Sequence, residues 1–216
     1  MSHITLVRHG QANTAARDEV SYDKLSPLGH QQASWLGAHL RDTGNHYPRV
    51  YCGTLVRHIE TAASMGVADP VRDVRLNEIE YFTLAKLLEE QKGVVVPKDR
   101  EGFVDHLPLT FAAWENDEID SPPETFTEFE TRVRSVLAEI SQGSGPAIVV
   151  TSGGLISMAM RQVLGLDTRS MARVALAIMN TSLHRLHTIG PDLSPVLFNA
   201  IPHLEAPDRQ YAQTHL

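Results

Sequence analysis

The sequence predicts an α/β fold, a three-layer, doubly wound, mostly parallel sheet with helices on both faces. Three segments share one order, in which a short apolar run leads through a polar turn into a helical pattern. The run 147–150 is apolar at every position, which is typical of a strand that is covered on both faces. Repeated alternation of strands and helices is the pattern that builds an α/β sheet.

The amino-terminal part supplies two of these units. The β-branched and aliphatic run 3–7 predicts a strand, and it ends abruptly at Arg8-His9-Gly10. Ser26 followed by Pro27 is typical of a helix start, and the apolar stripe behind it predicts a helix over 27–43. The next strand and helix are expected at 49–52 and 55–65.

The middle of the chain is less regular. A brief strand at 71–75 ends at Leu76-Asn77-Glu78, and a helix is expected near 82–91. Glycines and prolines then interrupt residues 92–122, which we interpret as a cap or insertion. No linker is evident, so we expect one domain over residues 1–216.

The carboxy-terminal part returns to regular elements. Apolar residues at helical spacing predict a helix over 126–140. The strand at 147–150 ends at Thr151-Ser152-Gly153-Gly154, before another helix. Two later strands are expected at 182–189 and 195–199. The tail after Pro202 is expected to be unstructured or loosely docked.

Composition restricts the classes of partner. The 216 residues carry a formal net charge of −7, which disfavours duplex nucleic acid and polybasic contact with a membrane. Small phosphorylated ligands need only a local cluster of charge and remain allowed. The single cysteine excludes an internal disulfide and a zinc ribbon. With no leader and no apolar run long enough to span a bilayer, we expect a cytoplasmic protein. Its oligomeric state stays open, a homodimer included.

Polar residues follow the predicted strands where a doubly wound sheet forms its ligand crevice. Guanidinium groups and the backbone N–H groups of a helix N-terminus suit phosphate oxygens. A neutral imidazole can attack phosphorus, provided that a positioned acid protonates the leaving oxygen. We therefore expect one phosphoryl site, without metal or cofactor, built from these residues: Arg8, His9, Arg57, Glu78, Ser152 and Gly153.

Four ordered motifs carry a resemblance to a known family. The chain resembles the histidine phosphatase superfamily, which includes phosphoglycerate mutases and many small phosphatases. The motifs are Leu6-Val7-Arg8-His9-Gly10-Gln11-Ala12, Leu25-Ser26-Pro27-Leu28-Gly29-His30-Gln31-Gln32-Ala33, Leu55-Val56-Arg57 with Thr61-Ala62, and Leu76-Asn77-Glu78.

The resemblance implies a phosphoglycerate mutase-like fold and a role for each residue. It implies that His9 is the phosphorylated nucleophile and that Arg8 and Arg57 bind the phosphoryl oxygens. It also implies that Glu78 is the general acid and later the base that activates water. Gly153 would contribute to substrate binding at the helix start.

Ser152 departs from the family pattern, which has a second histidine in this turn. A hydroxyl can donate one hydrogen bond but carries no positive charge. Losing a transition-state donor altogether costs on the order of 10²–10³ in rate, so partial retention by Ser152 predicts a slowed or differently tuned enzyme. Ser152 also suits a helix N-cap, which is compatible with ligand contact. His106 is an alternative source of imidazole, although a histidine in a surface loop is the simpler interpretation.

Two further departures concern substrate contacts. Many relatives carry an asparagine five residues after the motif glycine, whereas Ala15 stands there and Asn13 lies two residues earlier. The segment Pro123-Glu124-Thr125 lacks the glycine of the usual motif, and insertions of the phosphoglycerate mutase type are not recognisable. We therefore assign no substrate contact to Asn13 or to the segment 123–125, and the missing insertions favour phosphatase over mutase chemistry.

Three hypotheses follow. The first is a metal-independent phosphatase that hydrolyses a small phosphomonoester through a phosphohistidine at His9. The second is a catalytically weak phosphate-binding or regulatory protein, because Ser152 replaces the second histidine. The third is a phosphotransferase of the phosphoglycerate mutase type.

Overall fold

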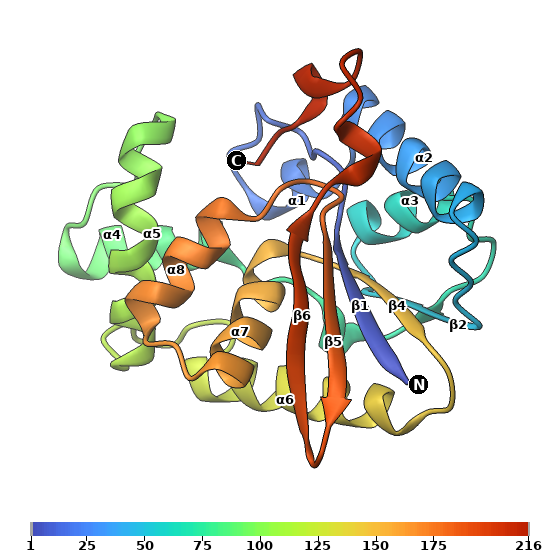
Figure 1. Cartoon of the computed structure of the whole chain (residues 1–216). Coiled ribbons are helices and arrows are strands. Elements are labelled where there is room, and N and C mark those ends of the chain that lie inside the picture. The colour runs from blue at the N-terminus through green and yellow to red at the C-terminus, as the bar shows by residue number, and fades with distance from the viewer. Residues whose placement is uncertain (1, 216) are drawn as a thin grey trace.

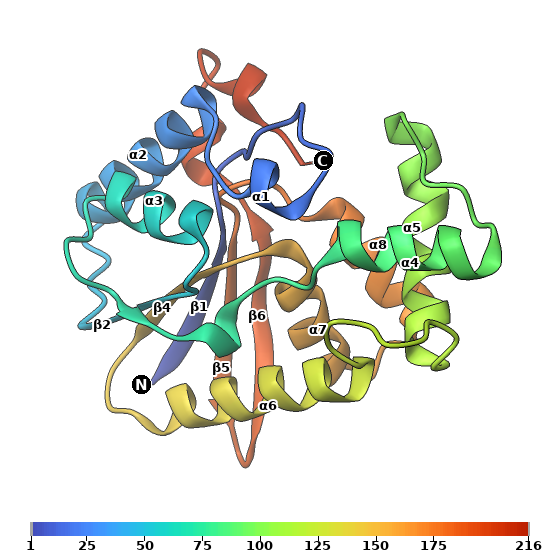
Figure 2. The ribbon, with the colours of Figure 1, turned by 180° about the vertical axis from the view of Figure 1, so that it is seen from behind.

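The computed structural model describes residues 2–215, apart from the side chain of Arg100. A six-stranded sheet with the order β3-β2-β4-β1-β5-β6 forms its centre. The strands β3, β2, β4 and β1 run parallel to one another. Strand β5 runs antiparallel to both of its neighbours, β1 and β6. Figures 1 and 2 show α2 and α3 on one side of the sheet, and α6, α7 and α8 on the other. The predicted α/β class with a mostly parallel sheet is confirmed.

The regular elements follow the chain in alternating order. The strands are β1 (His3–Arg8), β2 (Arg49–Cys52), β3 (Val71–Arg72), β4 (Ala147–Thr151), β5 (Leu183–Ile189) and β6 (Asp192–Ala200). The helices are α1 (Glu19–Tyr22), α2 (Pro27–Asp42), α3 (Val56–Ser64), α4 (Tyr81–Lys92), α5 (Arg100–Glu115), α6 (Phe126–Gln142), α7 (Gly153–Leu164) and α8 (Thr168–Ala177).

The central strand β4 is buried on both faces, as its apolar sequence predicts. Ala147 and Val149 belong to the larger hydrophobic core, which holds residues of α6 and α7. Ile148 and Val150 face the smaller core, which holds residues of α2 and α3. Each strand position therefore points alternately to one helical layer or the other.

Two segments differ from the expectation. Residues 100–115, expected to be irregular, form helix α5, whose Asp99 N-cap accepts a hydrogen bond from the Gly102 N–H at 2.8 Å. The helix tolerates Pro108 because Leu107, Phe111 and Trp114 lie on one side and are buried in the larger core. The role of residues 92–122 as a cap stays a prediction.

The carboxy-terminal tail, expected to be unstructured or loosely docked, is docked onto the domain. The Gln32 amide donates to the Ala212 carbonyl at 2.6 Å and to the Thr214 hydroxyl at 2.9 Å. The Asn180 N–H donates to the Thr214 carbonyl at 2.8 Å. The tail follows these long-range hydrogen bonds rather than a local sequence pattern. None of the helices formed by the described residues is long and apolar enough to cross a membrane.

Candidate active site

The ends of two neighbouring strands bring the first and the last of the predicted motifs together. β1 and β4 pair in parallel with Arg8 opposite Thr151. The His9 N–H then donates to the Thr151 carbonyl at 2.8 Å, which carries the pairing one step beyond the strands. Gly10 allows the chain to pass closely over Gly29, because a Cβ there would collide with the Gly29 carbonyl. The strand register therefore sets His9 beside Ser152.

His9 is 2% exposed and is held in one orientation. Its Nδ1 lies 2.7 Å from the Gly10 carbonyl oxygen, which can only accept a hydrogen bond. Nδ1 therefore carries the proton, and the lone pair of a neutral ring lies on Nε2. Burial, followed by the charges of Arg57 and Arg8, holds the pKa of His9 well below its usual value. The ring is thus kept in the nucleophilic form.

Arg8 and Arg57 are buried beside this ring, at 7% and 2% exposure. Arg57 forms an ion pair with Asp23 at 3.0 Å, and its guanidinium lies 5.1 Å from the centre of the Tyr22 ring. Arg8 donates to the Ile178 carbonyl and, among the described residues, pairs with no carboxylate. The Nε of each arginine is buried without a hydrogen-bond partner within residues 2–215. Buried charges of this kind favour an anionic ligand.

Glu78 lies at the N-terminus of α7, where its carboxylate accepts two backbone hydrogen bonds. The Gly154 N–H donates to Oε2 at 2.9 Å and the Ile79 N–H donates to Oε1 at 3.0 Å. Position 154 must be glycine for this contact, because a Cβ there would collide with Oε1 of Glu78. The carboxylate is therefore fixed next to the turn that carries Ser152.

Ser152 is the N-cap residue of α7, but its side chain makes no capping hydrogen bond. Its Oγ instead lies 2.6 Å from Nε2 of His58, and both residues are fully buried. His58 is not among the site residues that the sequence predicted, and this pairing was missed. The signal available was the position of His58 directly after Arg57, on the helix that borders the site.

The other histidine considered for this role does not take it. His106 is 4% exposed on α5, so the interpretation as a surface-loop residue is wrong. Its Nδ1 lies 2.9 Å from the Tyr81 hydroxyl and 3.0 Å from the Thr110 hydroxyl. Neither of these partners is one of the predicted site residues. The Asn13 amide donates to the Ser21 carbonyl at 2.9 Å.

Helix α1 adds residues that the sequence did not indicate. Asp23 accepts from Arg57, Tyr22 lies edge-on to His9 with ring centres 6.1 Å apart, and Glu19 accepts from the Phe82 N–H at 2.8 Å. Burial is the main cause that raises the pKa of Glu19 to about 7. A four-residue helix is too short to show a periodic pattern, and Glu19 reaches the site through a contact 63 residues away in sequence, so this second carboxyl could not be placed beforehand.

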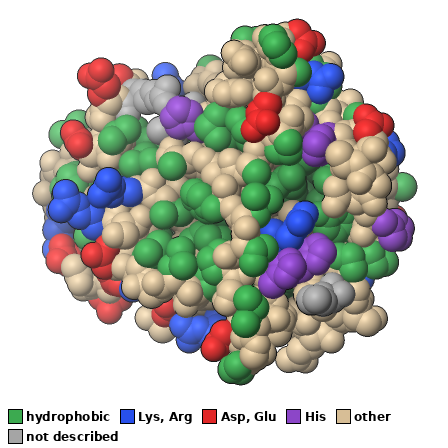
Figure 3. All heavy atoms as spheres, viewed as in Figure 1, with side chains coloured by type: hydrophobic (Ala, Val, Ile, Leu, Met, Phe, Trp, Pro, Cys, Tyr) green, Lys and Arg blue, Asp and Glu red, His purple; other side chains and the backbone are tan. Residues whose placement is uncertain are grey.

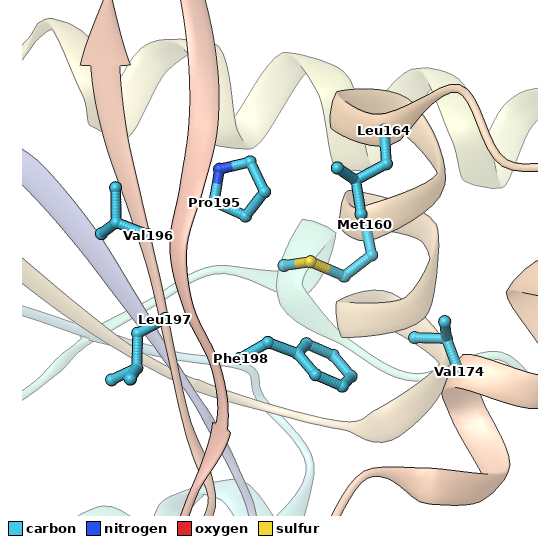
Figure 4. A pocket seen from close by; sticks show the side chains of 7 residues that line it. All are labelled: Met160, Leu164, Val174, Pro195, Val196, Leu197 and Phe198. Carbon is cyan, nitrogen blue, oxygen red and sulfur yellow. The ribbon is translucent and has the colours of Figure 1, made fainter.

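One hollow in the described structure touches the candidate site, and another lies apart from it. An apolar groove of about 360 Å³ lies between β6 and the helices α7 and α8, and it holds none of the predicted site residues (Figure 4). Apolar side chains gather over this face of the molecule (Figure 3). The other is a cleft of about 580 Å³ with Glu78 in its wall, lined also by Leu55, Arg75, Trp114 and Arg132 among others.

The fold and the strand-end residues together define an α/β protein with two buried arginines beside a buried, neutral histidine. A sequence profile of the histidine phosphatase superfamily (branch 1) matches residues 4–200, so the chain belongs to this family. The mitochondrial serine/threonine-protein phosphatase Pgam5 of Drosophila willistoni is 35% identical over 80 residues, which are 37% of this chain and 23% of that protein. The chain thus matches about a quarter of the length of this relative.

Solved structures share the fold over almost the whole chain. A phosphoserine phosphatase variant from Entamoeba histolytica, in complex with phosphoserine, has a TM-score of 0.70 at 17% identity, covering 94% of this chain and 100% of that one. The phosphoglycerate mutase of Bacillus anthracis has a TM-score of 0.67 at 19% identity, with 94% of each chain covered. A mycobacterial glucosyl-3-phosphoglycerate phosphatase has a TM-score of 0.65 at 23% identity, covering 92% and 98%.

Proposed function

We propose that the protein is a metal-independent phosphatase that hydrolyses a small phosphomonoester through a phosphohistidine on His9. The observation that carries this proposal is the buried Arg8 guanidinium without a carboxylate partner, next to an imidazole whose Nδ1 is anchored on the Gly10 carbonyl. An anion in this position would lie against the nucleophilic Nε2. The family membership and the phosphatases among the structural neighbours support the same chemistry.

The reaction has two balanced steps. In the first, Nε2 of His9 bonds to phosphorus, the bond from phosphorus to the ester oxygen breaks, and protonated Glu78 gives its proton to that oxygen. In the second, the Glu78 carboxylate takes a proton from water, the water oxygen bonds to phosphorus, and the bond to His9 breaks. Arg8, Arg57 and the N-terminus of α7 at Gly153 hold the phosphoryl oxygens in both steps.

Substrate selection is assigned to the cleft beside Glu78. Because Glu78 protonates the leaving oxygen, the organic part of the substrate extends towards this carboxyl and the cleft of about 580 Å³ behind it. The cleft combines apolar walls at Leu55 and Trp114 with charged residues of both signs, namely Arg75, Arg132, Glu78, Glu80, Glu124 and Glu128. It suits a small substrate with both apolar and polar parts.

The test is phosphate release from a panel of phosphomonoesters, a phosphopeptide included, in the presence of a metal chelator. Native protein is compared with His9→Ala and with His46→Ala, a control at an exposed histidine. We expect turnover in the native and His46→Ala proteins and none in His9→Ala. Equal turnover in all three would contradict the proposal.

A second candidate function is phosphate binding without turnover, and the observation that favours it is Ser152 in place of a charged imidazole. Binding of inorganic phosphate by folded protein that releases no phosphate from any ester would support it. A mutase remains a third candidate and is distinguished by its product, a phosphate moved between hydroxyl groups of one substrate.

A further inference from the structure

The contact between Ser152 and His58 is a buried hydrogen bond within the site. The two residues come from different helices, α7 and α3, and both side chains are completely shielded from solvent. The distance of 2.6 Å between Ser152 Oγ and His58 Nε2 is short for a neutral pair. The centres of the His58 and His9 rings are 5.8 Å apart.

The environment of His58 decides which nitrogen carries its proton. Burial, followed by the charge of Arg57, holds the pKa of His58 well below its usual value, so the ring is neutral. Its Nδ1 is buried with no hydrogen-bond partner among the described residues. A buried N–H without an acceptor is rarer in proteins than an unused acceptor. The proton therefore belongs on Nε2, which donates to Ser152 Oγ.

This donor sets the direction in which the Ser152 hydroxyl points its own hydrogen. An oxygen that accepts from His58 keeps its hydrogen for another acceptor. The turn at Ser152 and Gly153 runs along Arg8, because a Cβ at Gly153 would lie 3.7 Å from the Arg8 Nε. The turn that carries the Ser152 hydroxyl thus lies beside the arginine assigned to the phosphoryl group, and its partner His58 lies beside the imidazole of His9.

We propose that His58 is a positioning residue, which donates from Nε2 to Ser152 Oγ and so directs the Ser152 hydroxyl hydrogen towards a phosphoryl oxygen. The inference rests on the proposed function, because the phosphoryl group is the acceptor. The Ser152 hydroxyl thus donates an uncharged hydrogen bond to a phosphoryl oxygen on which negative charge develops in the transition state. Neither residue forms a covalent bond to phosphorus.

Gly53 provides the space that this arrangement needs. A Cβ at position 53 would collide with Nδ1 of His58 and would crowd the Asn77 side-chain oxygen at 2.7 Å. The ring therefore occupies the volume that a side chain at residue 53 would fill. His58 cannot swing away from Ser152 in that direction.

The test is a double-mutant cycle with Ser152→Ala and His58→Leu, measured as kcat and KM, with thermal unfolding as a check on folding. We expect each single variant to lose about 10²-fold in kcat and the double variant to lose no more than either. His58→Gln, whose amide nitrogen reaches the position of Nε2, should recover most of the loss. Independent losses that multiply, or no rescue by Gln, would overturn the proposal.

A second measurement keeps this inference separate from the proposed function. Should the native protein release no phosphate, the proposed function fails, and the cycle is then measured on the affinity for orthovanadate. Coupled losses of affinity would support the pair as an oxyanion contact, and additive or absent losses would overturn it. Nitrogen-15 NMR reports the tautomer directly, with the His58 signals identified by their loss in His58→Gln. A proton on Nδ1 of His58 would also overturn the proposal.

Discussion

Replacing Arg8 by Met should stabilise the protein while abolishing phosphate binding. The Arg8 guanidinium is 7% exposed and pairs with no carboxylate in the described part of the chain. Desolvating an unpaired ion costs several kcal/mol, whereas the lost hydrogen bond to the Ile178 carbonyl costs roughly 1–3 kcal/mol. We therefore expect the free energy of unfolding to rise by about 1–3 kcal/mol.

The matched control is Arg57→Met, because Arg57 is equally buried but is paired with Asp23 at 3.0 Å. Removing this partner leaves the Asp23 carboxylate, which is 19% exposed, without its ion pair. Arg57→Met should therefore lower the free energy of unfolding, by roughly 1–3 kcal/mol. The two arginines belong to one proposed phosphate site, but their substitutions should act on stability with opposite signs.

Thermal unfolding in phosphate-free buffer, repeated with saturating phosphate, measures both effects. At this chain length a change of 1 kcal/mol shifts Tm by about 2–4 °C, so Arg8→Met should unfold several degrees above the native protein. Phosphate at 100 times its Kd should stabilise native protein by about 2.7 kcal/mol and leave Arg8→Met unchanged. An Arg8→Met protein that is less stable than native without phosphate, or that phosphate still stabilises, would refute the reasoning.

Three further outcomes follow from the same geometry. Gly154→Ala should displace the Glu78 carboxylate and lower kcat by about 10–100-fold, with phosphate affinity retained; an unchanged kcat contradicts the assigned contact. The raised pKa of Glu19, about 7, means that the folded state binds the extra proton, so stability falls as pH rises from about 4.5 to 7. Glu19→Gln should remove this dependence, and urea midpoints from pH 4 to 8 measure it. Burial lowers the pKa of His184 and of His203 to about 3, so these groups take up protons only on unfolding and stability should fall as pH drops below about 6.5. The same midpoints in a His184→Gln, His203→Gln variant should be flatter below that pH.

The sequence predicted the fold because the strands and helices carry their own periodicity. The run 147–150 could be interpreted as a strand covered on both faces, and its partner β1 carries the apolar residues Ile4, Leu6 and Val7. The grouping of Arg8, His9 and Ser152 also followed, because parallel strands end at one edge of the sheet. These features depend on local patterns and on one topological rule.

The features that the sequence did not reveal depend on long-range contacts. Helix α5 looked irregular because Pro108 interrupts a helical pattern whose apolar side is stabilised only by the core. The tail has no pattern of its own and is held by Gln32 and Asn180. His58 can be assigned to the site only from the three-dimensional structure, in which its Nε2 lies 2.6 Å from Ser152 Oγ.

The most direct test of the central claim is the identity of the phosphorylated residue. Native protein is mixed with a phosphomonoester in the presence of a chelator, quenched in alkali during turnover, digested and mapped by mass spectrometry. We predict an alkali-stable, acid-labile phosphoryl group on His9, absent from His9→Ala and present in His46→Ala. An acid-stable phosphoryl group on Ser152 in a parallel sample quenched in acid, or turnover in His9→Ala at the native rate, would contradict the account.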